Sequence, residues 1–312
     1  MTGYLTTIQD QVWRLPVLTA WEILRTDGES CDSFFVRFAF EAAQLTTLRQ
    51  AVRFRAEEAG ETVFTGIVDE FEITASDGGL VAELIGRSLG GLLLDNETRA
   101  ATYLTATLSD ILKQYVYPLG ITRVDADQMI SLHNFAVDSG DTCQTALAGF
   151  CRHAAGVTPR FLADGTLQLR KSPAVSRRKI TAATEVTEAV VRMCRYGVIS
   201  EQVLVHSRTG AVEAVQNEDF VALGGRARKV TLTSGDTTRA QFRTAAQRIA
   251  ASNRELWTLE VTLPGAFLAE PQDTVAVTLP HLGVDQTLAV QQVCSRADQD
   301  GVRCTLTLGQ AL

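Results

Sequence analysis

The chain has 312 residues, enough for about two domains of ordinary size. Lysine and arginine number 29 and aspartate and glutamate 36, so the formal net charge is −7, and 46% of the residues are hydrophobic. This composition excludes wholesale disorder, and the acidic balance argues against a general nucleic-acid-binding protein. No apolar run reaches the roughly 20 residues that span a bilayer, and the start lacks the features of a signal peptide. We expect a protein made in the cytoplasm, without membrane insertion and without specific nucleic-acid binding.

Residues 1–96 have the two-residue period of β-strands. Residues 17–40 predict a hairpin that turns at Asp27-Gly28, because the second half of this segment places alternate large apolar side chains on one face. The apolar residues on that face are Phe34, Val36, Phe38 and Phe40. Further strands are expected near residues 51–56, 61–74 and 80–87. We therefore expect a compact, largely antiparallel β domain.

The period changes after the glycine-rich stretch 86–91, which we interpret as a tight bend. Apolar residues at three- and four-residue steps predict a helix within residues 88–116. They are Leu104, Leu108, Ile111, Leu112 and Tyr115. A second helix is expected to be capped by Asp141 and to end at Gly156, and a short hairpin to turn at Asp164-Gly165. Residues 97–175 are predicted to form a small α+β insertion domain.

From residue 176 onward the strand pattern returns. The expected strands lie near residues 190–196, 199–207, 211–216, 228–233, 257–263, 274–279 and 302–308. One long helix is expected at about residues 237–253. The predicted fold is α+β and predominantly β: two antiparallel β-barrel or sandwich domains, at 1–96 and 176–312, flank the insertion.

The residues that could carry chemistry do not form a recognisable site. The four histidines, His133, His153, His206 and His281, lie far apart, and none has a metal-ligand partner at a usual spacing. The six cysteines, Cys31, Cys143, Cys151, Cys194, Cys294 and Cys304, form no C-x-x-C pair and are expected to be reduced, mostly buried thiols. We predict no catalytic, cofactor-binding or metal-binding residues, and no cofactor.

Two local patterns were weighed as sites. Asp69, Glu70 and Glu72 are carboxylates on one expected strand, which could form a glycosidase pair but more simply face solvent or a lumen. The stretch from Gly86 to Gly91 follows a strand, but it lacks the lysine of a phosphate-binding loop and the spacing of a dinucleotide fingerprint. Neither pattern predicts an enzyme.

Several motifs taken in order resemble one known family. Their positions are residues 63–69, 86–88, 93–95, 135–170, 195–200, 259–261, 264–265 and 273–275. Together they resemble the baseplate hub proteins of contractile phage tails, the late-control D family, including hubs of prophage-type elements and phage-tail-like bacteriocins of Gram-positive bacteria. One departure is Gln272-Asp273, where the family often has Gly-Asp.

The resemblance implies a structural role. Such hubs are homotrimers whose subunits each supply two similar tube-type β domains, so three chains build a ring of pseudo-sixfold symmetry. The implied partners are further copies of the chain, a tail tube protein or tube initiator, a trimeric spike protein and other baseplate proteins. The implied location is the tail baseplate of a virion or bacteriocin particle, after synthesis in a bacterial cytoplasm.

Two alternatives stay open at this point. Gly140-Asp141-Thr142 with the helix that follows resembles the start of a LysM-like domain, which binds peptidoglycan. A cell-wall hydrolase is the other, although the chain ends at Leu312, directly after its last expected strand, which leaves no room for an added catalytic domain.

Overall fold

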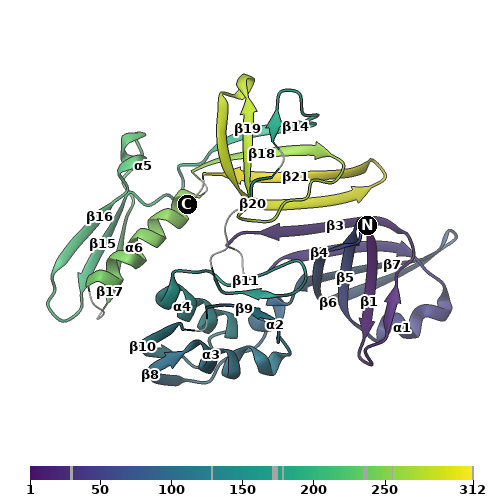
Figure 1. Ribbon diagram of the computed structural model, residues 1–312, viewed down its shortest axis with the longest axis horizontal. Coiled ribbons are helices and arrows are strands. Elements are labelled where there is room, and N and C mark those ends of the chain that lie inside the picture. The colour runs from purple at the N-terminus through teal and green to yellow at the C-terminus, as the bar shows by residue number, and fades with distance from the viewer. Residues whose placement is uncertain are drawn as a thin grey trace. The chain divides into compact units, whose positions relative to one another are not determined.

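The computed structural model describes residues 1–28, 31–127, 129–170, 175–177, 179–234, 238–254 and 256–310 (Figure 1). The chain divides into two compact units. Unit 1 contains residues 1–173, 265–267 and 292–304, and unit 2 contains residues 174–264, 268–291 and 305–312. The predicted three-domain division at residues 96 and 175 stays a prediction.

Unit 1 contains a large antiparallel sheet with the strand order β20-β3-β4-β7-β6-β5-β1-β2. Its strands are β1 (Thr2–Thr7), β2 (Val12–Arg14), β3 (Leu18–Thr26), β4 (Ser33–Ala39), β5 (Ala51–Glu58), β6 (Glu61–Ser76), β7 (Gly79–Ser88) and the second half of β20 (Val284–Asp298). The short helices η1 (Ala42–Gln44) and α1 (Leu45–Arg49) connect β4 to β5. Its core is aromatic: the rings of Phe34 and Phe54 stack with their centres 4.2 Å apart. The hairpin predicted within 17–40 is confirmed.

The rest of unit 1 is an α+β segment with its own hydrophobic cluster, into which Leu147 and Phe150 are buried. Its elements are α2 (Gly90–Leu94), β8 (Ala101–Thr107), α3 (Leu108–Tyr115), η2 (Tyr117–Leu119), β9 (Val124–Asp125), β10 (Ser131–Val137), α4 (Cys143–Ala155), β11 (Arg160–Phe161) and β12 (Leu167–Gln168). Ile67 of β6 also packs against this cluster, so the segment covers part of the sheet.

Two details of the α+β segment differ from expectation. Leu104 belongs to strand β8, not to a helical stripe, and its side chain is 84% exposed. The helix begins only after Thr107, whose hydroxyl accepts a hydrogen bond from the backbone N–H of Asp110. The cap of α4 is Thr142 rather than Asp141, because the hydroxyl of Thr142 accepts the N–H of Thr145 at 3.0 Å.

Unit 2 combines a β-sheet with a smaller αβ substructure. Its elements are β13 (Ile180–Thr181), β14 (Glu188–Met193), β15 (Glu201–His206), β16 (Val212–Gln216), α5 (Glu218–Ala222), β17 (Lys229–Ser234), α6 (Thr238–Asn253), β18 (Trp257–Pro264), β19 (Thr274–Leu279), η3 (Pro280–Leu282), the first half of β20 and the second half of β21 (Gly301–Gly309), whose first residues belong to unit 1. β15 lies between β16 and β17, and α6 packs against β15 (Figure 1). The long helix expected near residues 237–253 is confirmed from Thr238 on; residue 237 lies outside the described residues.

The chain contains two sets of four strands in the same order. The first set is β3-β4-β7-β6 and the second is β14-β18-β21-β20. In each set the last two strands form a hairpin with two residues between them, from Ser76 to Gly79 and from Asp298 to Gly301. The structure is thus α+β and predominantly antiparallel β, which confirms the predicted fold class.

Candidate functional site

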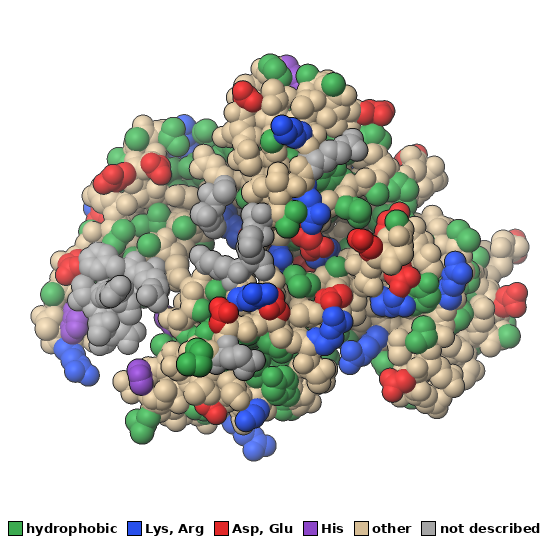
Figure 2. Space-filling view, in the orientation of Figure 1, with side chains coloured by type: hydrophobic (Ala, Val, Ile, Leu, Met, Phe, Trp, Pro, Cys, Tyr) green, Lys and Arg blue, Asp and Glu red, His purple; other side chains and the backbone are tan. Residues whose placement is uncertain are grey.

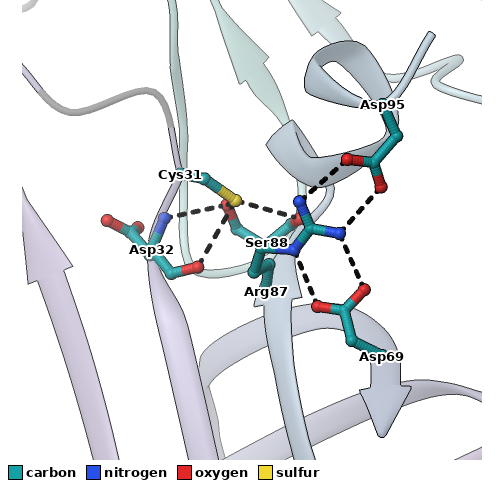
Figure 3. Close-up of polar contacts among 6 residues, drawn as sticks. All are labelled: Cys31, Asp32, Asp69, Arg87, Ser88 and Asp95. Atoms are coloured by element: carbon teal, nitrogen blue, oxygen red, sulfur yellow. Dashed lines mark hydrogen bonds and ion pairs between the residues drawn. The ribbon is translucent and has the colours of Figure 1, made fainter.

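An arginine clamp holds the point where the sheet of unit 1 passes into α2. Arg87 on β7 donates from Nε and Nη2 to the two carboxylate oxygens of Asp69 on β6, at 2.7 and 2.9 Å. It also donates from Nη1 and Nη2 to both oxygens of Asp95, at 3.0 and 2.7 Å (Figure 3). Asp95 is the residue that ends α2, so one guanidinium group ties the helix to two strands.

The electrostatics of the clamp are those of a structural contact. Hydrogen bonding from Arg87 lowers the pKa of Asp95 below its ordinary value. The same two carboxylates raise the pKa of Arg87 further above its already high value, so the guanidinium group stays charged. A carboxylate held ionised by a permanent cation is a poor general acid. The clamp therefore ties the end of β7 to the end of α2.

A second group of contacts closes the same strand end. Asp32 N–H donates to the hydroxyl of Ser88 at 3.2 Å, and the Cys31 sulfur lies 3.3 Å from that hydroxyl (Figure 3). The backbone N–H of Ser88 donates to the carbonyl of Asp32 at 2.9 Å. Burial raises the pKa of the Cys31 thiol above its ordinary value, which keeps it protonated. A protonated thiol is a weak nucleophile, so this cysteine serves packing and hydrogen bonding.

Two glycines of this region, Gly66 and Gly86, allow close packing between neighbouring strands. Gly86 lies within strand β7, and a Cβ placed on it would stand 2.0 Å from the Ile67 carbonyl oxygen and 2.5 Å from the Phe34 ring. A Cβ on Gly66 of β6 would stand 2.1 Å from the carbonyl oxygen of Arg87. Gly86 thus lets strands and aromatic rings approach each other, while the bend expected within residues 86–91 falls at Leu89, between the end of β7 and the start of α2.

The histidines weighed as site residues stay apart. His133 lies on β10 with Nδ1 2.8 Å from the Thr105 hydroxyl, and His153 lies in the last turn of α4. His206 ends β15, and His281 belongs to η3. Among the residues that the structure describes, no group of three His, Cys, Asp or Glu side chains could hold a metal ion. In the same described part of the chain, no helix is long and apolar enough to cross a membrane.

The cysteines are free thiols. Cys143, Cys151 and Cys304 are buried, as their apolar positions predicted, and Cys31, Cys194 and Cys294 are half-buried. Burial raises the pKa of Cys151 to about 12. This residue therefore acts as a small hydrophobic side chain in the core of the α+β segment.

The departure at residues 272–273 has a backbone consequence. Gln272 has a φ of +78°, in the left-handed region that favours glycine. The carboxylate of Asp273 follows, where it accepts the backbone N–H of Glu270 at 2.7 Å and pairs with Arg177 at 2.5 Å. Gln272 thus adopts a backbone conformation that glycine takes at lower cost.

Two strand segments expose apolar side chains along an edge. The first is the end of β6, where Phe71 is 38% exposed beside the carboxylates of Glu70 and Glu72. The second is β14, which ends its sheet and exposes Val191 and Met193, at 37% and 51%. Exposed apolar edge strands promote pairing with another chain. Sequence patterns had assigned both segments to strands, but only coordinates reveal which strand edges are left open.

The surface carries charges of both signs. On the face shown in Figure 2, acidic and basic side chains of the described residues are interspersed with hydrophobic ones. The visible basic residues do not gather into one continuous patch.

The architecture matches that of tail proteins. A tail protein from Neisseria meningitidis MC58 has a TM-score of 0.80 at 19% sequence identity, and the match covers 99% of this chain and 96% of that one. The 43 kDa tail protein of prophage MuSo2 from Shewanella oneidensis has a TM-score of 0.77 at 17% identity, covering 99% and 98%. This chain therefore has the fold of phage tail proteins.

A third structure is more distant. The E. coli c3393 protein, described as a component of the type VI secretion system with structural similarity to T4 bacteriophage tail proteins gp27 and gp5, has a TM-score of 0.53 at 12% identity. The match covers 95% of this chain and 74% of that one. No family model matches the sequence, and no curated protein matches it. At these identities the likeness defines the fold.

Proposed function

We propose that this chain is a structural baseplate hub of a contractile tail or tail-like particle. The observation that carries the proposal is the pair of four-strand sets with one strand order inside a single chain. A chain with two such sets supplies two similar ring positions, so three copies supply six. A trimer of this kind can continue a sixfold tail tube on one face and seat a threefold spike on the other.

The fold comparison supports this position in the particle. The Neisseria meningitidis and Shewanella oneidensis proteins are tail proteins that this chain matches over nearly their whole length. The third is described as similar to T4 bacteriophage tail proteins gp27 and gp5, which supports a role in a tail. We propose a tail tube protein or tube initiator, a spike protein and other baseplate proteins as partners. Both phage virions and tail-like bacteriocins are particles in which this role fits.

The proposed role is mechanical. The Arg87 clamp and the raised thiol pKa values favour rigid packing over reactivity, and we assign no catalytic step to this chain. In this role the α+β segment would lie on the periphery of the ring that the strand sets form, or toward the spike. Peptidoglycan binding by that segment is the competing function that the sequence left open.

Electron microscopy of the purified full-length protein tests the proposal. Class averages viewed along the axis should show a closed ring with six similar lobes and threefold symmetry. Co-sedimentation of the same protein with purified peptidoglycan is the companion measurement. Sedimentation with peptidoglycan by a protein that forms no ring would overturn the hub proposal and favour the wall-binding alternative.

A further inference from the structure

The junction between β20 and β3 shows how one strand set continues into another. The second half of β20 pairs antiparallel with β3, with Val293 opposite Arg25 and Ser295 opposite Ile23. β20 is the last strand of one set and β3 is the first strand of the other. The other last strand is β6, which corresponds to β20. The other first strand is β14, which corresponds to β3.

The last strands, β6 and β20, can be aligned by counting residues back from their hairpin turns, so that Ser76 corresponds to Asp298. Val293 and Ser295 of β20 then correspond to Phe71 and Ile73 of β6. The pairing of β5 with β6 ends at Ile67, so the segment beyond the bulge pairs with β7 alone among the described strands. The β20 segment has a partner strand on each side, β21 and β3, whereas the β6 segment has β7 on one side and no described strand on the other.

The middle strands of the two sets match as well. The Thr262 hydroxyl lies 3.0 Å from the Thr305 hydroxyl on β21, and the backbone N–H of Gly265 donates to the carbonyl oxygen of Val302 at 2.8 Å. We align β18 with β21 antiparallel on these two contacts. In that register Val261 lies opposite Leu306, as Val36 lies opposite Leu84 in the first set. Val36 and Val261 are therefore equivalent.

The first strands follow from the middle ones. Ile23 pairs with Phe34 and Val191 pairs with Leu259, the residues two positions before the equivalent valines. Val191 on β14 is therefore the counterpart of Ile23 on β3. The neighbouring position, Met193, is the counterpart of Arg25, which faces β20.

Equivalent residues differ in burial where a neighbouring strand is missing. Ile23 is 4% exposed and Val293 is 4% exposed at the junction that the chain makes with itself. Their counterparts Val191 and Phe71 are 37% and 38% exposed. The end of β6 and strand β14 thus expose apolar side chains whose counterparts on β20 and β3 are buried.

We propose that the end of β6 in one copy of the chain pairs antiparallel with β14 of a second copy, in the register of the β20–β3 junction. This inference rests on the trimeric ring proposed above and names the strands that close it. The register places Phe71 opposite Met193, Glu72 opposite Arg192 and Ile73 opposite Val191. Two apolar pairs flank one pair of opposite charges, which is the cross-strand pattern that stabilises an antiparallel sheet.

The pairing is head-to-tail, because β6 and β14 are different surfaces. A head-to-tail interface forms a closed ring when the rotation from one copy to the next adds up to a full turn, and every copy then uses both of its interface surfaces. Closure would also remove the exposed edges of both strands. A slip of one residue would turn every apolar side chain of the strand to the other face of the sheet. It would also separate Glu72 from Arg192, so both features favour the same register.

Disulfide trapping tests the register. In a background in which Cys194 is replaced by Ser, Ile73→Cys combined with Val191→Cys should form intermolecular disulfides under mild oxidation, giving covalent trimers on a non-reducing gel. Opposed residues in a paired sheet lie within the Cα separation that a disulfide spans. The control is Ile73→Cys with Arg192→Cys, which the register places on opposite faces and which should stay uncrosslinked.

The outcomes separate this inference from the hub proposal. Crosslinking of the matched pair alone supports it. A protein with trimeric mass that does not crosslink at the matched pair, or that crosslinks equally at the control pair, overturns the register and leaves the hub proposal intact. A protein that stays monomeric at every concentration, both alone and with a spike protein, overturns both.

A charge exchange gives a second measurement that does not depend on cysteine chemistry. Glu72→Arg alone and Arg192→Glu alone should each shift the assembly toward monomer by placing like charges opposite each other. The double variant Glu72→Arg with Arg192→Glu should regain the trimer. Loss of the trimer in the double variant as well, with the chain still folded by circular dichroism, would count against the pairing.

Discussion

Arg87 donates two hydrogen bonds to the carboxylate of Asp95, eight residues further along the chain, while it holds Asp69 with two more. This contact joins the end of a strand to the end of a short helix. The sequence stretch from residue 86 to 88 carries part of the resemblance to hub proteins. The structure gives that stretch a physical role, since its arginine fixes the direction in which the chain leaves the sheet.

Removing the clamp should lower stability. Arg87→Met leaves Asp69 and Asp95 without their cation, and we expect the free energy of unfolding to fall by about 1–2 kcal/mol, because charged hydrogen bonds are worth about 1.5–3 kcal/mol and the site is partly exposed. Urea unfolding followed by circular dichroism measures this. The matched control is Arg37→Met, which breaks a single ion pair of 3.3 Å with Glu83 on the same sheet and should cost at most about 0.5 kcal/mol. Equal losses in the two variants would contradict the clamp.

The clamp should also depend on pH in a defined direction. The pKa of Asp95 is lowered in the folded protein, so its ionised form stabilises the fold above the ordinary carboxyl value of 3.8. That stabilisation should be lost as the pH falls through the lower folded value. The difference in unfolding free energy between the natural protein and Asp95→Asn should therefore shrink from pH 7 to pH 3. A difference that stays constant over this range would show that the charge of Asp95 contributes nothing.

Gly86→Ala tests the close packing of the sheet. The added Cβ would meet the Ile67 carbonyl oxygen at 2.0 Å, so backbone must move and we expect a loss of about 3 kcal/mol. The control is Gly149→Ala on α4, where the Cβ would meet no atom within 4 Å and helix propensity favours alanine by about 1 kcal/mol. Thermal unfolding of both variants should move in opposite directions. A Gly86→Ala protein as stable as the natural one would refute the packing role.

The turn between β5 and β6 can be improved. Ala59 and Gly60 both have positive φ, +51° and +86°, the geometry of a type I′ turn that favours Asn-Gly. Ala59→Asn should therefore raise the free energy of unfolding by about 0.5–1 kcal/mol, since alanine is strained in the left-handed region. Gly60→Ala should lower it by about 1–2 kcal/mol by adding a second strained residue. Stability measurements that rank these variants in the reverse order would contradict the turn geometry.

Much of the strand pattern could be predicted because alternation reports burial directly. Phe34, Val36 and Phe38 alternate along the chain, and all three are buried on one face of β4. Leu104 was misassigned because its spacing to Leu108 is helical, although it belongs to a separate strand and faces solvent. Spacing within a sequence cannot distinguish one helix from a strand followed by a helix when both contribute apolar residues.

The interface proposed between β6 and β14 could not be predicted from the sequence for a different reason. Val191 and Ile23 show similar local patterns, and the difference in burial arises from strands far away in the chain. The correspondence between the two strand sets also lies in their order and register, which no repeat of 20 to 50 residues reveals. Arg87 belongs to the motif at residues 86–88, but its partners Asp69 and Asp95 come from other elements. Sequence spacing alone does not pair them.

The mass of the protein in solution tests the central claim most directly. Light scattering of the full-length chain over a range of concentrations, alone and with a candidate spike protein, gives the number of copies in the assembly. The hub account predicts three copies, or a monomer that becomes a complex of three chains with three spike chains. A protein that remains monomeric at all concentrations and is indifferent to the spike would contradict it.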